Sequence, residues 1–218
     1  MLELTAVAAQ ELRDDLYVPD AAIEAIRVAL PVIAMVCERA AREFSEDEGD
    51  DANLFGQQCS RRSRNLIARE IQSRPKMRAE VRRPRGSLVV LGGETRLYFW
   101  AAGDAQGSPR LTGGHTKPEI LDACLRQLVL WETLPVSTPS HLVVAYRATP
   151  SAPGLLKVIA GIPCAADQWQ CAVELLDDSG VYDAPVAIEA IAAEERFDAE
   201  QPLAPVLQLR PREERGEH

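Results

Sequence analysis

The sequence predicts an α+β protein in which an N-terminal helical layer packs on a mostly antiparallel β-sheet, with one further helix inserted between strands. Apolar residues recur at helical spacing in the first third of the chain, whereas later segments alternate or run apolar between turn residues. The 218 residues, 46% hydrophobic, suffice for one sizeable core. We expect one domain over 1–210, helical in 1–75 and sheet-rich in 76–210, with a disordered charged tail at 211–218.

The helical part is expected to begin with two helices. A short one covers about residues 2–14. The next starts at Asp20, which follows Pro19 and can cap the helix with its side chain. Pro31 predicts a kink or a break within this helix, because proline removes a backbone donor. The apolar stripe of the helix contains Ile23, Ile26, Leu30, Ile33, Cys37, Ala40 and Phe44.

A third helix is expected over about 52–73. It follows the acidic stretch 45–51, which we interpret as a solvated connection, and Pro75 ends it. The acidic stretch precedes the helix and arginines fill its later turns, an order that suits the helix dipole. Its apolar side is formed by Cys59, Ser63, Leu66, Ile67 and Ile71.

The segment 87–100 is the clearest hairpin in the chain. Ser87–Leu91 and Thr95–Trp100 are the two strands, and Gly92-Gly93 between them fits a two-residue turn that needs positive φ. Both strands are apolar nearly throughout, so we expect both faces of the sheet to be covered here.

The rest of the chain is predicted to add one helix and several strands. A Gly/Ser/Pro-rich loop over 103–117 leads to a helix over about 118–132, and loops separate the segments that follow it. The predicted strands are His141–Ala148, Leu155–Ile162 and Gln168–Leu176, with a short helix or coil at Ala184–Ala193 and a last strand at 206–210.

The net charge of −9 hides a basic block. Residues 1–58 carry a net charge of −9, residues 59–86 carry +8 and residues 87–218 carry −8. The overall balance disfavours non-specific binding of the whole chain to nucleic acid or to an anionic membrane. The block is a local feature, and a partner responds to local fields.

The basic block places arginines and carboxamides on one side of the third helix. Arginine pairs with carboxylates and phosphates, so this side is a candidate surface for an acidic protein or for nucleic acid. The other explanation is a solvated surface, or one paired internally with Glu46–Asp51. The candidate residues are Gln58, Arg61, Arg62, Asn65, Arg69 and Gln72, with a secondary basic patch at Arg82, Arg83 and Arg85.

Catalytic and metal-binding motifs are not evident in the sequence. The three histidines form no HxH or HExxH pattern and the five cysteines no CxxC pair, so we expect no metal and five free thiols in a reducing compartment. Neither a phosphate-binding glycine motif nor a GxSxG motif occurs, so we expect no cofactor and no catalytic residue. Glu94-Thr95-Arg96 departs from the Glu-x-Lys of restriction-type nucleases, and a nuclease-like enzyme stays the least favoured explanation.

These observations predict a non-enzymatic regulatory or interaction protein that binds an acidic protein partner through its arginine-rich helix. Bacterial antitoxins, phage accessory proteins and assembly subunits often show the same lack of catalytic and metal-binding motifs. The alternative is a DNA-binding regulator that uses helix 52–73 for recognition and the 87–100 hairpin as a wing. No apolar run approaches the roughly 18 residues of a membrane helix and no secretory signal is visible, so we expect a cytoplasmic protein with no membrane partner.

Overall fold

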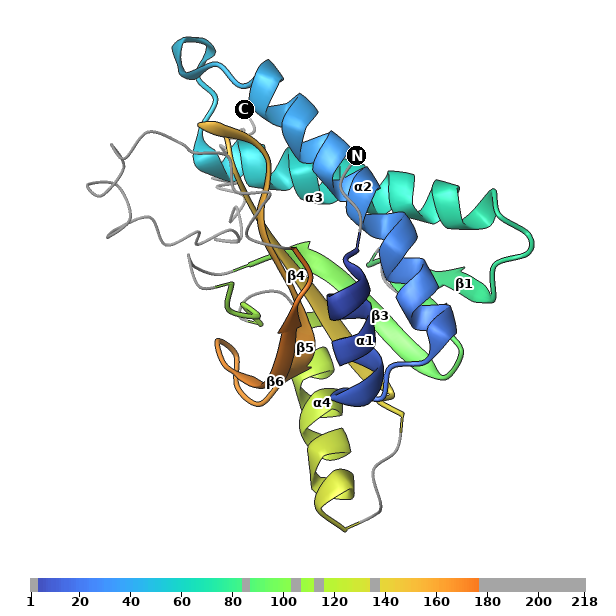
Figure 1. Cartoon of the computed structure of the whole chain (residues 1–218). Coiled ribbons are helices and arrows are strands. Elements are labelled where there is room, and N and C mark those ends of the chain that lie inside the picture. Colours follow the sequence, from blue (N-terminus) through green and yellow to red (C-terminus); the bar gives the residue numbers. More distant parts are fainter. Residues whose placement is uncertain (1–3, 84–86, 103–106, 112–115, 134–137, 177–218) are drawn as a thin grey trace, which may run out of the picture.

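The computed structural model of the chain describes residues 4–83, 87–102, 107–111, 116–133 and 138–176 (Figure 1). Within these residues the chain forms four α-helices, one short 3-10 helix and six strands. In chain order they are α1 (Ala6–Asp14), α2 (Asp20–Glu43), η1 (Glu46–Glu48), α3 (Ala52–Gln72), β1 (Ala79–Arg82), β2 (Val89–Gly92), β3 (Thr95–Ala101), α4 (Thr116–Thr133), β4 (His141–Thr149), β5 (Ala152–Pro163) and β6 (Trp169–Glu174).

The six strands form one sheet in which sequence neighbours are also spatial neighbours, in the order β1-β2-β3-β4-β5-β6. Every pair is antiparallel except β3 and β4, which are parallel. A parallel pair needs a long crossover, and α4 lies within that connection. The prediction of an α+β fold with a mostly antiparallel sheet and one inserted helix is therefore confirmed.

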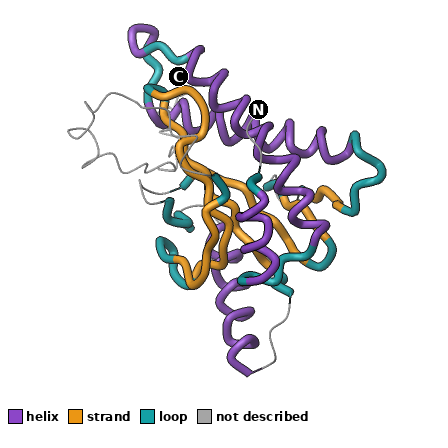
Figure 2. The backbone as a smooth tube through the Cα atoms, in the orientation of Figure 1, coloured by secondary structure: helices purple, strands orange, loops and turns teal. Residues whose placement is uncertain are grey.

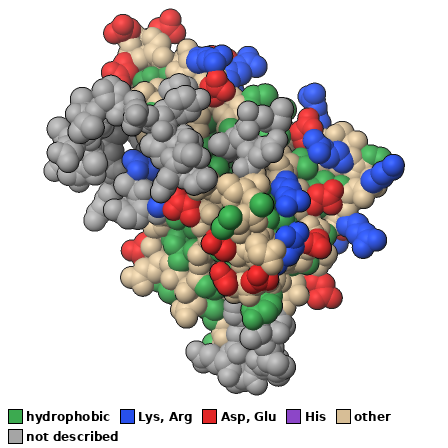
Figure 3. All heavy atoms as spheres, in the orientation of Figure 1, with side chains coloured by type: hydrophobic (Ala, Val, Ile, Leu, Met, Phe, Trp, Pro, Cys, Tyr) green, Lys and Arg blue, Asp and Glu red, His purple; other side chains and the backbone are tan. Residues whose placement is uncertain are grey.

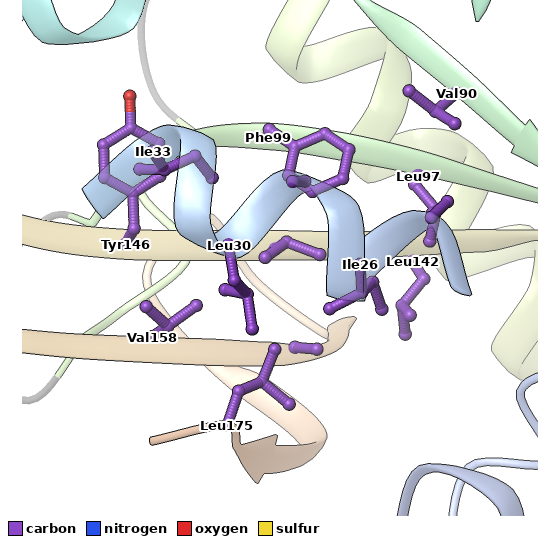
Figure 4. Packing of buried hydrophobic residues seen from close by; sticks show 14 of the residues in the cluster. Ile26, Leu30, Ile33, Val90, Leu97, Phe99, Leu142, Tyr146, Val158 and Leu175 are labelled. Carbon is purple, nitrogen blue, oxygen red and sulfur yellow. The ribbon is translucent and has the colours of Figure 1, made fainter. Parts of the chain in front are cut away.

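Helix α2 forms the centre of the core. It lies across one face of the sheet, and its residues Ile26, Leu30 and Ile33 are fully buried (Figure 4). Because side chains alternate along a strand, one face of the sheet supplies the residues that meet this helix. They include Val90, Leu97, Phe99, Leu142, Tyr146, Val158 and Leu175, which Figure 4 shows around α2. Helix α3 runs beside α2 in the same layer (Figure 2).

The opposite face of the sheet is covered by α4 and by residues 107–111. The Trp100 indole donates to the carbonyl of Pro109 at 2.7 Å, and the Trp169 indole donates to the carbonyl of Gly107 at 3.0 Å. Val143 on this face is completely buried. The apolar hairpin strands are thus buried from both sides, as their sequence predicts.

One local prediction about α2 is wrong, and of the kink or break expected at Pro31 the break does not occur. Asp20 is its first residue and not its cap: Pro19 occupies the cap position without a side-chain hydrogen bond, and the Asp20 carboxylate pairs with Arg13 at 2.8 Å. The helix also continues through Pro31 without a break. Extensive burial of α2 on both sides of this proline compensates for the backbone hydrogen bond that proline cannot make.

The hairpin forms where it is predicted, but its turn is one residue later. Gly92 pairs with Thr95, so the two turn residues are Gly93 and Glu94. Gly93 has φ of +65° and Glu94 does not have positive φ, as in a type II′ turn with glycine first. Gly92 belongs to β2, where it allows α2 to approach closely: a Cβ atom at this position would lie 2.3 Å from Cα of Ala22.

The other predictions have mixed outcomes. The predicted helices and strands between residues 2 and 176 are all present, within a few residues at each end. The sequence does not predict strand β1, because Ala-Glu-Val-Arg lacks an apolar run. This segment becomes a strand by pairing with β2. The predicted helix at 184–193, the strand at 206–210 and the tail at 211–218 lie outside the described residues.

Gly93→Val should destabilise the protein, because a β-branched residue resists the positive φ that the turn requires. We expect a loss on the order of 1–3 kcal/mol in the free energy of unfolding, measured by urea denaturation. Gly93→Asn is the control and should lose less, since asparagine tolerates this conformation better. Equal stability of the valine variant and the wild type would contradict the turn assignment.

Gly92→Ala should also destabilise the protein, but through packing. The added methyl group would meet the backbone of Ala22 at 2.3 and 2.6 Å, so α2 must move away from the sheet. We expect a loss of about 1–3 kcal/mol or more by urea denaturation. Ala22→Gly in the same chain should not restore stability, because the clash is with backbone atoms. Recovery in that double variant would show that the contact is not as close as described.

Candidate functional site

Helix α3 presents the six predicted residues on one side, which we call the arginine face: Gln58, Arg61, Arg62, Asn65, Arg69 and Gln72. The helix begins at the Asp51 cap, whose carboxylate accepts from the Leu54 backbone N–H at 2.6 Å. Its other side is buried against α2 and the sheet, with Ile67 fully enclosed. Arg61, Asn65, Arg69 and Gln72 are exposed, whereas Gln58 and Arg62 are half-buried. The helical periodicity therefore separates the basic side from the apolar side as predicted.

One member of the arginine face is neutralised within the protein. Arg62 pairs with Glu43 at 2.5 Å, where α2 ends beside α3. Glu43 also pairs with Arg39 at 2.6 Å, and the two guanidinium groups hold the pKa of its carboxyl below the usual range. Glu43 is thus an internal partner of the face that sequence reasoning did not identify, because it precedes the acidic stretch.

The acidic stretch itself does not fold back onto the arginine face in the part of the chain that is described. Glu46–Glu48 form η1, Asp50 accepts from the Ser45 backbone N–H at 2.9 Å, and Asp51 caps α3. At a rise of about 1.5 Å per residue, Arg69 lies about 27 Å along the helix from Asp51. Neither Arg61 nor Arg69 forms an ion pair with any described residue.

The secondary basic patch is divided by the fold. Arg83 donates to the Asn65 side-chain oxygen at 3.1 Å, which brings it onto the arginine face. Arg82 instead pairs with Glu80 at 2.9 Å on the exposed side of β1. Arg85 lies outside the described residues. Figure 3 shows basic side chains gathered on the flank where α3 ends and β1 begins, with acidic side chains among them.

A second polar cluster, absent from the sequence predictions, lies on the α4 side of the sheet. The Tyr98 hydroxyl and His141 Nδ1 are 2.9 Å apart, and the two rings stack at a centroid distance of 5.9 Å. Arg96 approaches His141 Nε2 at 3.3 Å, and the Gln127 side-chain oxygen accepts from the His141 backbone N–H at 2.8 Å. The parallel pairing of β3 with β4 brings these residues together, and no sequence spacing indicates it.

The hydrogen bonds of this cluster define the tautomer of His141. Arginine has no acceptor, so Nε2 must accept from Arg96. The neutral ring then carries its proton on Nδ1 and donates to the Tyr98 oxygen. Burial lowers the pKa of His141 to about 4, with Arg96 and Arg126 adding to the shift, while burial raises the pKa of Tyr98 to about 12. Both groups are therefore neutral at physiological pH, and the cluster joins β3 to β4.

Two other kinds of feature are absent from the described residues. They contain no group of three or more His, Cys, Asp or Glu side chains placed to hold a metal ion. None of their helices is both long enough and apolar enough to span a bilayer. The arginine face, in which Arg61 and Arg69 are exposed and form no ion pair with described residues, is the candidate functional site.

The Tyr98–His141 cluster predicts a pH dependence of stability. The pKa of His141 in the folded protein is about 4, below the ordinary 6.5, so the unfolded chain binds more protons between these values. The cluster's contribution should be complete above pH 6.5 and should decline as the pH falls towards 4. His141→Gln removes the titration, so the stability difference between wild type and variant, from urea denaturation, should shrink over this window. A difference that stays constant from pH 7 to pH 4 would contradict the assignment.

The chain was compared with protein-family models, curated proteins and solved structures, and none of them matches it.

Proposed function

We propose that this protein is a non-enzymatic regulatory or interaction protein that binds an acidic surface of a protein partner through the arginine face of α3, extended by Arg83. One observation carries the proposal. Arg61 and Arg69 are exposed on a rigid helix and form no ion pair with described residues, although the chain contains more acidic than basic side chains. A cytoplasm-like reducing compartment and a bacterial source belong to the same proposal, supported by the unpaired cysteines and the preference for arginine over lysine.

The architecture suits recognition of carboxylates. The buried side of α3 fixes the helix against α2 and the sheet, so its exposed arginines are presented from a rigid support. Arginine offers a planar fork of donors that matches a carboxylate with two hydrogen bonds. Gln58, Asn65 and Gln72 add side-chain amides that can donate or accept around such a pair.

The fold gives less support to the DNA-binding alternative. The hairpin 87–100 was expected to serve as a wing, but β2 lies between β1 and β3, and β3 lies between β2 and β4. Its strands are buried on both faces, which leaves mainly the turn at Gly93 and Glu94 for outside contacts. Duplex DNA is therefore the control ligand of the test.

Arg61→Glu combined with Arg69→Glu tests the proposal. Arg62 is left intact because its reversal would oppose Glu43 and disturb the α2–α3 contact. Proteins captured from a lysate by the tagged wild type are compared with those captured by the variant, and each lost partner is then titrated by interferometry. Affinity should fall at least about tenfold, with the larger loss at low salt, because like charges then face each other with little screening.

Arg27→Glu combined with Arg126→Glu is the matched control. It makes the same change in charge at exposed positions on α2 and α4, outside the arginine face. This variant should keep the partner, and both variants should keep the wild-type circular dichroism spectrum. Equal loss of binding in both double variants would show that binding responds only to net charge. If the Arg61→Glu, Arg69→Glu variant keeps every partner, the proposal is wrong. Duplex DNA binding at physiological salt, lost only in the first variant, would favour the DNA-binding alternative.

A further inference from the structure

The two edges of the sheet differ in how well they are protected. β1 ends the sheet on one side and β6 ends it on the other. β1 has four residues, its exposed Glu80 and Arg82 form an ion pair, and α3 packs against it. Short length, charge and a covering helix are means by which proteins prevent a strand edge from pairing with another chain. β6 is longer, at six residues, and contains neither lysine nor proline (Figure 1). The less protected edge is therefore β6.

The backbone of β6 presents hydrogen-bonding groups along its outer side. The Leu175 N–H donates to the Val158 carbonyl at 2.8 Å, so the backbone groups of Leu175 point towards β5. In an antiparallel ladder, alternate residues point their backbone groups to opposite sides of the strand. Gln170, Ala172 and Glu174 therefore point theirs away from β5, where these groups make no hydrogen bond to a described residue. The side chains of the same three residues are exposed, so a partner strand can reach this edge.

One antiparallel register pairs the three outward-pointing residues with a second copy of themselves. About a two-fold axis at Ala172, this residue lies opposite its own copy and Gln170 lies opposite the partner's Glu174. Each such pair exchanges two backbone hydrogen bonds. The Gln170 side-chain amide can also donate to the carboxylate opposite it, on both sides of the axis. A register centred on Glu174 would instead oppose two carboxylates, so the charge pattern selects the register centred on Ala172.

The helix beside this edge supplies apolar surface for the same arrangement. α1 packs against both α2 and β6. It carries Val7, which is 67% exposed, the largest exposed fraction among the large hydrophobic side chains of the described residues. The two-fold axis of such a pair is perpendicular to the sheet, so both copies of α1 lie on one side of the joined sheet. Pairing at β6 thus brings a second α1 towards Val7.

We propose that β6 is a dimerisation edge, on which a second copy of this chain pairs antiparallel about Ala172 and joins the two sheets into one. The backbone groups of the edge supply the affinity, and the side-chain pairs across the axis determine the register. The inference does not depend on the acidic partner proposed above. α3 packs against β1 at the opposite edge of the sheet, so the dimer leaves the arginine face of each copy accessible.

Sedimentation equilibrium of the wild type over a wide range of protein concentrations tests the dimer. We expect the mass of the particle to rise reversibly from that of one chain to that of two. Amide hydrogen exchange, followed by NMR, locates the contact: Gln170, Ala172 and Glu174 should exchange more slowly in the dimer, whereas Val173, which points towards β5, should be protected in both states. The mass of a single chain at every concentration overturns the proposal, and so does a dimer in which these three amides gain no protection.

Two lysine variants on β6 test the register. Ala172→Lys places like charges opposite each other at the axis, and because this position is exposed the fold itself should not change. We expect the association constant of the dimer to fall at least about tenfold. Gln170→Lys is the matched control: it makes the same change in charge on the same strand but faces the partner's Glu174, so the dimer should be retained or strengthened, most of all at low salt.

Equal weakening of the dimer by both lysine variants would show a response to net charge only and would overturn the register. A wild-type dimer that Ala172→Lys leaves intact would show that the chain associates through another surface. The Arg61→Glu, Arg69→Glu variant should dimerise like the wild type, because the arginine face lies outside this edge. Failure of the dimer and failure of the proposed function are therefore separate results.

Discussion

The burial of α2 is the constraint on which the rest of the structure depends. Twelve of its 24 residues are buried, because the helix meets the sheet on one side and other helices on its flanks. This contact requires a glycine at position 92, where β2 passes the backbone of Ala22. Once α2 is held on the sheet, α3 has one surface left on which to bury its apolar side, and its arginines must face outward.

The single parallel pair organises the opposite side of the molecule. An all-antiparallel meander could connect its strands with tight turns, whereas the step from β3 to β4 requires a crossover. That crossover supplies α4 and residues 107–111, which cover the second face of the sheet. It also aligns Arg96 with His141, so that a neutral histidine, a tyrosine and an arginine meet in a cluster that joins the two strands.

Helix α3 has two sides of different chemistry. Its outer side carries the exposed arginines, and its inner side carries Cys59 and Ser63. Arg62 belongs to both environments: it pairs with Glu43 at the helix contact, and its charge lowers the pKa of Cys59.

The sequence by itself determined the helices, five of the six strands and the basic side of α3, because periodicity and turn residues are local properties of the chain. Only the tertiary structure decided which charges are paired, since Glu43 lies 19 residues from Arg62 and Asn65 lies 18 from Arg83. The same holds for β1, which is a strand through its pairing with β2, and for the continuity of α2 through Pro31. The meeting of Tyr98 with His141 likewise depends on how distant segments pack, which no local pattern encodes.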